Sequence, residues 1–326
     1  MKILHVTYHH GCRLNIDYVC KTLGYDVTTQ IANWNYNIGK NLANHIWEKH
    51  KDYYNSFDCV ITSDTAPLSR IFLQNNYSKK LIIWVCNRFD YYDQYGFNDL
   101  DQEKFPDKAY YDLFREGITR KNVKVYSYTK FEHEYADFKS GINWNEIIKP
   151  CAVAFEKSEK TAFPESVIKS NTFLITKYHN DTIFMDLKAK CDSLGIQNYC
   201  GQYYGPHDLE GIKGIIHIPY AWANLAMFEN WSLGTVYFIP SKSFILKLMK
   251  DGPFFWSPPF PTQYIESSEW YLPEHKDLFI YFDSWEHLKN LTKDDALIKA
   301  KKNKVLDFSN SHTQICLDKW KEALQC

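Results

Sequence analysis

The stretch of sequence with the most specific chemistry surrounds Glu229. Residues 214–241 have the pattern of a strand, a loop, a helix that begins at Leu225, a glycine stop at Gly234 and a second strand. Asn224 precedes the helix, where an asparagine side chain caps free backbone N–H groups. The start of a helix offers N–H groups and a positive dipole end to an anion such as a diphosphate. Glu229, about one turn further on, could accept hydrogen bonds from the vicinal hydroxyls of a ribose.

Glu229 could instead be a solvated carboxylate on the surface of the helix. Its neighbours Met227, Phe228, Trp231 and Leu233 are apolar, which indicates a helix that is mostly buried. A buried acid is costly unless it has a partner. The pattern therefore favours a binding role for Glu229, while the surface alternative stays open.

A second set of polar residues follows the strands predicted in the first half of the chain. Parallel strands end at one edge of a sheet, where open α/β sheets bind their ligands, so we expect these residues at that edge. A histidine or a carboxylate there could take the proton of a hydroxyl group as a general base. The candidates for the base are His10, Asp64 and Asp90. The candidates for contacts with the acceptor, the molecule that carries this hydroxyl group, are His9, Gly11, Asn87 and Arg88.

Each of these candidates also has a structural interpretation. His9 and His10 are adjacent, so at most one of them can point into a site from an extended segment, and either could be a turn histidine bonded to backbone groups. Asp64 and Asp90 could cap helices or pair with Arg88. The sequence does not choose between these alternatives.

The elements that would position these residues follow an α/β rhythm. Short apolar runs alternate with longer amphipathic ones, which is typical of βα units around a parallel sheet. Helices are expected at 14–23, closed by Gly24, and at 42–54, 294–304 and 313–324. Strands are expected at 2–8, 26–30, 58–63, 81–86, 123–128 and 147–153, and then at 172–178, 197–201, 214–219, 236–240 and 278–283.

The same rhythm in both halves predicts an α/β fold of two Rossmann-like domains that face each other across a cleft. The expected domains are 1–156 and 172–326, joined by a polar linker at 157–171. A long loop is expected at 252–276, because its prolines suit neither helix nor central strand. The terminal helix has apolar positions that suit docking on a neighbouring surface.

Composition excludes several classes of function. Across 326 residues, 38 Lys and Arg balance 39 Asp and Glu. The chain therefore has no net positive charge that would attract nucleic acid. Nine cysteines without CxxC spacing indicate reduced core thiols rather than a zinc site. No signal peptide and no apolar run long enough to cross a membrane is present, so we expect a cytoplasmic protein, for which peripheral membrane contact stays possible.

The 214–241 segment resembles the donor-binding element of GT-B fold glycosyltransferases. In that family the helix glutamate binds the ribose of the nucleotide, a role that the resemblance assigns to Glu229. Residues 173–179 resemble the strand whose following loop supplies a cation for the diphosphate, with Lys177 first and His179 next. Residues 199–206 resemble the turn that approaches the base of the nucleotide. The resemblance implies that 1–156 is the acceptor side and 172–326 the donor side. The donor contacts that it implies are Lys177, Gly201, Tyr204, Tyr220, Asn224, Leu225 and Glu229.

The resemblance implies a glycosyltransferase that moves a sugar from a nucleoside-diphosphate sugar to an acceptor hydroxyl on a sugar or glycan. Many retaining members carry two glutamates, and the first would fall near Ala221 here, so the stereochemical course stays open. GT-B enzymes hold the diphosphate without a metal, so neither a metal nor a cofactor is expected. The D-x-D letters of 99–101 stand in a polar loop. The alternatives are a nucleotide-sugar epimerase of similar fold and an inactive sugar-binding protein.

Overall fold

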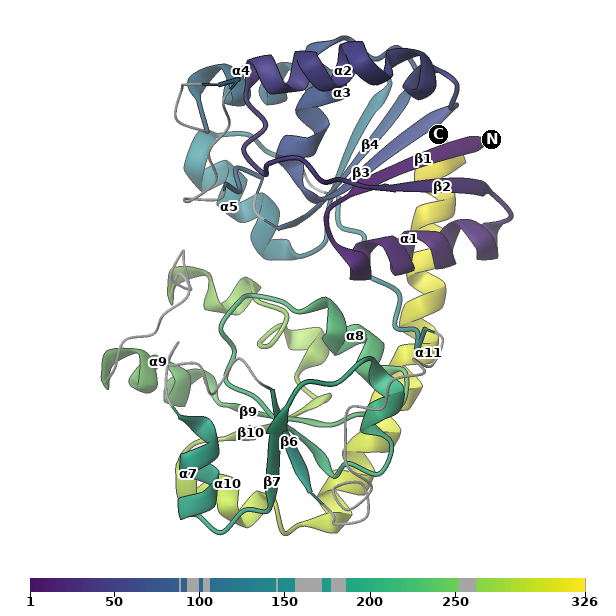
Figure 1. Cartoon of the computed structure of the whole chain (residues 1–326). Coiled ribbons are helices and arrows are strands. Elements are labelled where there is room, and N and C mark those ends of the chain that lie inside the picture. The colour runs from purple at the N-terminus through teal and green to yellow at the C-terminus, as the bar shows by residue number, and fades with distance from the viewer. Residues whose placement is uncertain are drawn as a thin grey trace. The chain divides into compact units, whose positions relative to one another are not determined.

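The computed structural model of the chain contains two compact units (Figure 1). The N-terminal unit comprises Met1–Pro150 together with Ile315–Cys326, and the C-terminal unit comprises Cys151–Gln314. The contacts thus place the last residues of the chain with the N-terminal unit, whereas the sequence suggested one C-terminal domain to the end. The structure describes residues 1–87, 89–92, 100–101, 106–144, 146–155, 172–176, 186–251 and 262–325.

The described residues of the N-terminal unit form a five-stranded parallel sheet in the order β2-β1-β3-β4-β5. The strands are β1 (Lys2–Thr7), β2 (Asp26–Ile31), β3 (Cys59–Thr65), β4 (Lys80–Asn87) and β5 (Val123–Ser127). The helices are α1 (His10–Leu23), α2 (Lys40–Asn55), α3 (Arg70–Gln74), α4 (Lys108–Gly117) and α5 (Lys130–Ser140), with a short 3-10 helix η1 (Ala66–Ser69). Helix α1 lies on one face of the sheet and α2 and α3 lie on the other (Figure 1).

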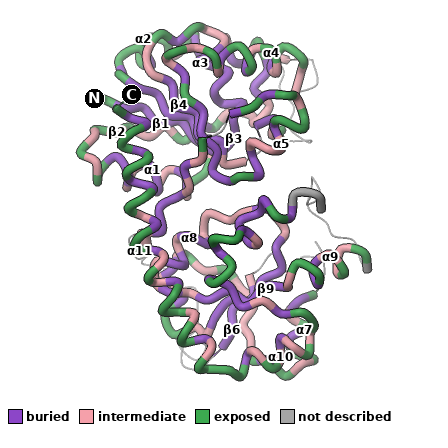
Figure 2. Tube along the Cα trace, turned by 180° about the vertical axis from the view of Figure 1, so that it is seen from behind, coloured by how far each residue is buried: buried purple, intermediate pink, exposed green. Residues whose placement is uncertain are grey.

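Burial follows from this layered arrangement. Every residue of β3 is buried, as expected of a central parallel strand that is covered on both faces. The helices bury one side and expose the other (Figure 2). The strand predicted at 147–153 is wrong: Ile147 makes a single bridge to Ser127. Pro150 explains the difference, because it has no N–H group for a ladder.

The C-terminal unit repeats the topology of the first. Its described strands are β6 (Phe173–Thr176), β7 (Asn198–Gly201), β8 (Gly214–Ile216), β9 (Tyr237–Pro240) and β10 (Phe279–Phe282), all parallel in the order β10-β9-β8-β6-β7. The helices are α7 (Leu187–Ser193), α8 (Leu225–Trp231), α9 (Lys242–Asp251), α10 (Trp285–Leu291) and α11 (Asp295–Gln325), with 3-10 helices η3 (Pro206–Leu209), η4 (Thr262–Ser267) and η5 (Pro273–His275).

In each sheet, the first strand of the unit lies between the second and the third. The chain therefore leaves the first and third strands toward opposite faces, which creates the point where open α/β sheets bind ligands. That point is the end of β1 and β3 in one unit and of β6 and β8 in the other. The prediction of two Rossmann-like α/β units is confirmed.

The C-terminal segment is one continuous helix, α11, and the prediction of two separate helices is wrong. The polar stretch between them contains neither glycine nor proline, and Phe308 within it packs on Trp231 and His275. Tertiary packing here overrides weak helix propensity. Near the end of α11, Trp320 is fully buried against Trp84, so the predicted docking of the terminal helix is confirmed. No helix in the described ranges is both long and apolar enough to cross a membrane.

Candidate functional site

Asp64 stands at the binding edge of the N-terminal sheet, at the end of β3. Its φ angle of 74° lies in the left-handed region, which costs a non-glycine residue about 1–2 kcal/mol. The ladder between β3 and β4 is irregular at this point, because Asp64 pairs with Val85 and Thr65 pairs with Asn87, so that Cys86 is the extra residue of a bulge. Bulges and strained backbone both occur preferentially next to functional sites.

The surroundings of Asp64 suit proton transfer. Burial, with a further contribution from Cys12, raises the pKa of the Asp64 carboxyl from 3.8 to about 7, while His9 acts in the opposite direction. A catalytic acid or base works best when its pKa lies near the working pH. Of the three residues predicted as a base, Asp64 therefore has the most suitable environment.

The two histidines have different places. His9 caps α1: its Nδ1 accepts hydrogen bonds from the N–H groups of Gly11 at 3.1 Å and Cys12 at 3.4 Å. His9 is thus bonded to backbone groups, as one of its two interpretations from the sequence predicted. His10 is exposed in the first turn of α1, and burial and then Arg13 lower its pKa. Gly11, a predicted acceptor contact, lies in the same turn of α1.

Cys12 is a residue of this edge that the sequence did not single out. It is fully buried in the first turn of α1. Burial raises the pKa of its thiol, but hydrogen bonds with Cys86 and His9 outweigh that effect and bring the pKa to about 6. A helix N-terminus also favours a thiolate. Its place three residues after a capping side chain is the signal that could have identified it.

Asp90 holds two tyrosines rather than an open position. It is buried, and its Oδ2 accepts hydrogen bonds from the hydroxyls of Tyr111 at 3.1 Å and Tyr135 at 3.3 Å. These bonds favour a structural role for Asp90. Asn87 is half-buried at the end of β4, opposite Thr65. Arg88 lies outside the described residues.

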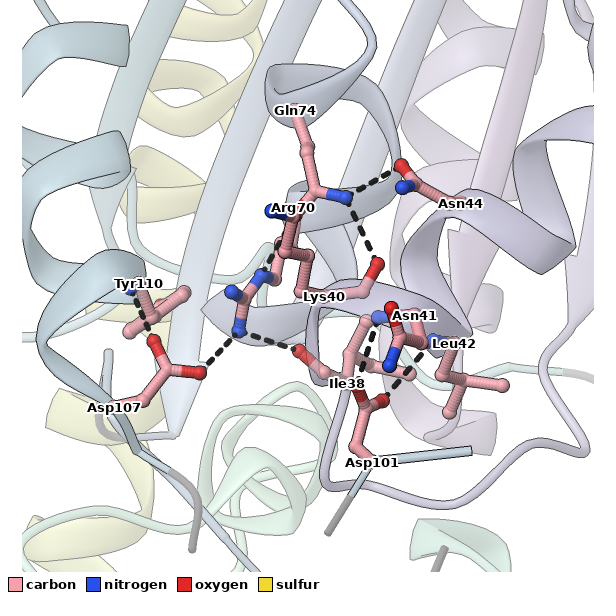
Figure 3. A network of polar contacts seen from close by, with 10 residues as sticks. All are labelled: Ile38, Lys40, Asn41, Leu42, Asn44, Arg70, Gln74, Asp101, Asp107 and Tyr110. Carbon is pink, nitrogen blue, oxygen red and sulfur yellow. Dashed lines mark hydrogen bonds and ion pairs between the residues drawn. The ribbon is translucent and has the colours of Figure 1, made fainter. Parts of the chain in front are cut away.

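A buried arginine fixes the loops that surround this edge (Figure 3). Arg70 is 1% exposed, and its Nη1 donates to the Ile38 carbonyl at 3.2 Å and to the Asp107 carboxylate at 3.0 Å. Its Nε donates to Gln74 at 3.1 Å. Asp107 in turn caps α4, accepting from the N–H of Tyr110 at 2.6 Å. One guanidinium thus joins the loop after β2, helix α3 and the start of α4.

The start of α2 is fixed by a second acid from the same region. Asp101 accepts from the N–H groups of Asn41 at 2.7 Å and Leu42 at 3.0 Å (Figure 3). The capping position of α2 is Gly39, which has no side chain to do this. A Cβ at Gly39 would collide with the Asp101 carboxyl, so any other residue here would displace this cap. Of the predicted D-x-D letters, Asp101 is thus a helix cap, and Asp99 lies outside the described residues.

In the C-terminal unit, the helix start predicted at Leu225 is confirmed. Asn224 caps α8, its Oδ1 accepting from the N–H of Ala226 at 3.0 Å. After the helix, Gly234 has a φ angle of 75°, the left-handed conformation expected of a glycine stop. Thr235 then bonds back to the Asn230 carbonyl at 3.1 Å, which completes this end.

Glu229 lies on α8 beside the phenols of Tyr203, which is half-buried, and Tyr237, which is buried. The Glu229 side chain is half-buried, so it is neither fully solvated nor enclosed. Burial raises the pKa of Tyr203 to about 12, and the charge of Glu229 contributes to this rise. Burial also raises the pKa of Tyr237, and Tyr203, Tyr220 and Glu229 add to the effect. The carboxylate therefore lies within electrostatic reach of both hydroxyls.

Asn230 organises this group of residues, and the sequence did not point to it. It is fully buried, and its Nδ2 donates to the hydroxyls of Tyr203 at 2.8 Å and Tyr237 at 2.7 Å. These bonds join the turn after β7, helix α8 and strand β9. The place of Tyr203 within the predicted base-binding turn was the one available signal.

The remaining donor candidates are placed as follows. Gly201 ends β7, and Tyr204 is exposed with its N–H donating to Asp208 at 2.7 Å. Tyr220 lies in the loop between β8 and α8, its ring 5.5 Å from that of His217. His217 itself is buried, and its ring lies 4.7 Å from that of Trp270. Lys177, His179, the linker at 157–171 and residues 252–261 of the predicted loop lie outside the described residues.

Metal ligands do not gather in either unit as far as the structure describes it. In those ranges, no three side chains of His, Cys, Asp or Glu are grouped so that they could hold a metal ion.

Comparison with known proteins identifies the fold. No protein-family model matches the sequence, and no curated protein sequence matches it. A glycosyltransferase from Rickettsia africae has a TM-score of 0.57 at 14% identity, over 99% of this chain and 98% of that chain. A Streptomyces glycosyltransferase solved with thymidine diphosphate has a TM-score of 0.51 at 9% identity, over 97% and 98%.

A third structure of similar fold is that of a putative epimerase rather than a glycosyltransferase. A putative UDP-N-acetylglucosamine 2-epimerase from Listeria monocytogenes has a TM-score of 0.52 at 9% identity, over 99% of this chain and 95% of that chain. At these identities the similarities establish the fold alone. The chain has a GT-B-like α/β fold with two parallel Rossmann-like sheets, as its sequence resemblance implied.

The ion pair of Arg70 is expected to be essential for stability. Replacing Arg70 by methionine leaves Asp107 and the Ile38 carbonyl without their buried donor, which should lower the free energy of unfolding by about 3 kcal/mol. Arg115→Met is the matched control, because its bridge to Asp112 is about half exposed and should contribute less than about 1 kcal/mol. Urea denaturation measures both. Equal losses in the two variants would contradict this account.

The raised pKa of Asp64 predicts a pH-dependent stability. Between pH 3.8 and about 7, the folded chain holds a proton on Asp64 that the unfolded chain releases. Stability therefore falls as the pH rises through this window. Asp64→Asn removes the effect and tolerates the left-handed backbone. We expect the wild type to lose stability relative to this variant on titration, while the exposed Asp52→Asn tracks the wild type. Parallel stability curves would show that Asp64 titrates normally.

Proposed function

We propose that the protein is a glycosyltransferase that moves a sugar from a nucleoside-diphosphate sugar to an acceptor hydroxyl. The proposal depends on the place of Glu229 in a GT-B-like fold. This residue is half-buried on helix α8, which follows the third strand of the C-terminal unit. The Streptomyces glycosyltransferase of similar fold, solved with thymidine diphosphate, supports a nucleotide ligand.

The donor binds the C-terminal unit in this proposal. Glu229 accepts hydrogen bonds from the ribose hydroxyls, and Tyr220 lines the loop at the end of β8. The turn at 201–206 approaches the base of the nucleotide. Asn230 links that turn to α8 through its hydrogen bond to the Tyr203 hydroxyl. The diphosphate is held by the N–H groups at Asn224 and Leu225 together with the predicted cation Lys177. This arrangement requires no metal.

The acceptor binds the N-terminal unit, where Asp64 acts as the base in an inverting course. The acceptor oxygen forms a bond to the anomeric carbon while the bond from that carbon to the diphosphate oxygen breaks. The nucleoside diphosphate leaves with the electron pair, and the hydroxyl proton passes to Asp64 and then to solvent. Asp64 is preferred to Asp90, whose Oδ2 accepts from two phenols, and to the exposed His10.

A nucleotide-sugar epimerase is the second candidate, favoured by the fold similarity to the putative epimerase from Listeria. An epimerase converts the nucleotide-sugar without an acceptor, whereas a transferase needs one. Incubating the protein with the nucleotide-sugar alone, and following the sugar by NMR, separates the two. An isomer formed without an acceptor would replace the transferase proposal.

A thermal-shift screen against UDP-, GDP-, ADP- and dTDP-sugars tests the proposal directly. A ligand present at 100 times its dissociation constant stabilises the folded state by about 2.7 kcal/mol. We expect one nucleotide to raise the melting temperature well above the others. A flat response to all four nucleotides would overturn the proposed function.

Glu229→Gln is expected to weaken nucleotide binding. Losing charge-assisted hydrogen bonds to the ribose should raise the dissociation constant of the nucleotide about 10- to 100-fold. Glu286→Gln, an exposed glutamate on α10 of the same unit, is the control and should bind as the wild type does. Isothermal titration calorimetry with the nucleotide found in the screen measures the change. Unchanged affinity in Glu229→Gln would remove the ribose role.

Asp64→Asn is expected to reduce turnover without affecting donor binding. A general base contributes about 10²- to 10⁴-fold to the rate, so kcat should fall by that order while nucleotide affinity stays unchanged. Asp90→Asn serves as the comparison, because a structural acid should change stability more than kcat. If Asp90→Asn abolished turnover and Asp64→Asn did not, the assignment of the base would be reversed.

A further inference from the structure

Three tyrosines from three separate loops converge in the N-terminal unit. Tyr8 follows β1, Tyr36 lies between β2 and α2, and Tyr91 follows β4. The ring centroids of Tyr8 and Tyr36 are 4.2 Å apart, and those of Tyr36 and Tyr91 are 5.4 Å apart. The planes are inclined by 33° and 65°, so the rings form a curved surface rather than a flat stack. We call these three residues the tyrosine wall.

Tyr8, at one end of the tyrosine wall, lies near Asp64. The members of the wall follow the carboxyl ends of β1, β2 and β4, and Asp64 ends β3, which lies between β1 and β4. Burial raises the pKa of Tyr8, and the charges of Tyr36 and Asp64 raise it further. Tyr8 is thus within electrostatic reach of both the next ring of the wall and the predicted base.

The wall is held in place by neighbouring contacts. The Tyr8 hydroxyl donates to the Asn35 carbonyl at 2.9 Å, and the Asn35 side chain accepts from the N–H of Asn37 at 2.8 Å. Arg70 binds the Ile38 carbonyl next in the chain (Figure 3). A binding surface fixed in this way loses little conformational entropy when a ligand arrives.

Exposure distinguishes the wall from ordinary core packing. All three tyrosines are half-buried, whereas core aromatics of the same unit such as Tyr54 and Phe72 are fully buried. The loop that carries Tyr36 alternates aromatic residues with Asn33, Asn35 and Asn37 (Asn-Trp-Asn-Tyr-Asn). It therefore brings aromatic faces and amide groups to one place.

A sugar matches this combination of groups. Its C–H face packs on aromatic rings, which bury a large area in a defined geometry. Its hydroxyls need donors and acceptors, and polar groups that lost water without such partners would oppose binding. A purely hydrocarbon ligand would pack on the rings but could not exchange a hydrogen bond with the Asp64 carboxyl.

We propose that the tyrosine wall is the acceptor subsite and that it binds a sugar with one hydroxyl directed at Asp64. This inference rests on the proposed function, because it assigns the residues that bind the acceptor sugar. It adds Tyr8, Tyr36 and Tyr91 to the binding residues of the N-terminal unit.

Saturation-transfer difference NMR on the full chain tests the proposal. The probes are the methyl glycosides of glucose, galactose, mannose and N-acetylglucosamine, each at millimolar concentration, with and without UDP, GDP, ADP or dTDP. We expect saturation of the ring protons of at least one glycoside. Absence of transfer to every glycoside under all of these conditions would overturn the proposal.

The variants locate the binding surface. Tyr36→Ala should weaken glycoside binding at least tenfold, and Tyr36→Phe, which keeps the ring, should restore it. Tyr53→Ala is the matched control, because Tyr53 is an exposed tyrosine near the end of α2, away from the carboxyl ends of the strands. If Tyr36→Ala is poorly folded, Tyr91→Ala replaces it. Glycoside binding that is unchanged in the alanine variants would place the sugar elsewhere.

The nucleotide-induced thermal shift, recorded on the same samples, separates the two proposals. A normal shift without glycoside binding rejects the wall and leaves the transferase proposal standing. Glycoside binding that depends on Tyr36 without any nucleotide shift keeps the wall as a sugar site and rejects the transferase.

Discussion

Parallel strands end at the same edge of a sheet, and in each unit this constraint places the candidate residues that the structure describes. In both units the first strand lies between the second and the third, so the chain diverges at the ends of those two strands. His9 and Cys12 follow β1 and Asp64 ends β3, which brings them to one point although more than fifty residues separate them in sequence. Glu229 owes its place to the same rule, because α8 follows β8.

The constraint does not by itself fix the loops, and Arg70 does so in the N-terminal unit. A guanidinium that is 1% exposed is costly to bury unless all of its bonds are made. Here its partners come from the loop after β2, from α3 and from the N-terminus of α4. The hydrogen bonds to these partners offset the energy needed to bury the charge. They also hold the loop after β2, which presents Tyr36.

Much of this could be predicted from the sequence because the signals are local. Apolar β-branched runs indicated the strands, Asn224 and Gly234 marked the two ends of α8, and Gly24 closed α1. The other features depend on contacts between residues far apart in the chain, which no local sequence pattern indicates. The left-handed backbone of Asp64, the two bonds of Asn230 and the meeting of Tyr8 with Tyr36 all arise from tertiary packing. For the same reason a polar stretch that resembled a loop became the middle of α11, where Phe308 is packed on Trp231.

The environments of the two central acids suggest a division of roles. The carboxyl of Asp64 has a pKa of about 7, so it can gain and lose a proton near neutral pH. Glu229 instead lies near Tyr203 and Tyr237, whose pKa values burial raises far above neutral, with the charge of Glu229 adding to the rise. Those phenols stay protonated during any reaction near pH 7, so they can offer hydrogen bonds but cannot act as bases. Proton transfer is therefore suited to the N-terminal unit, and hydroxyl recognition by fixed hydrogen bonds is suited to the C-terminal unit.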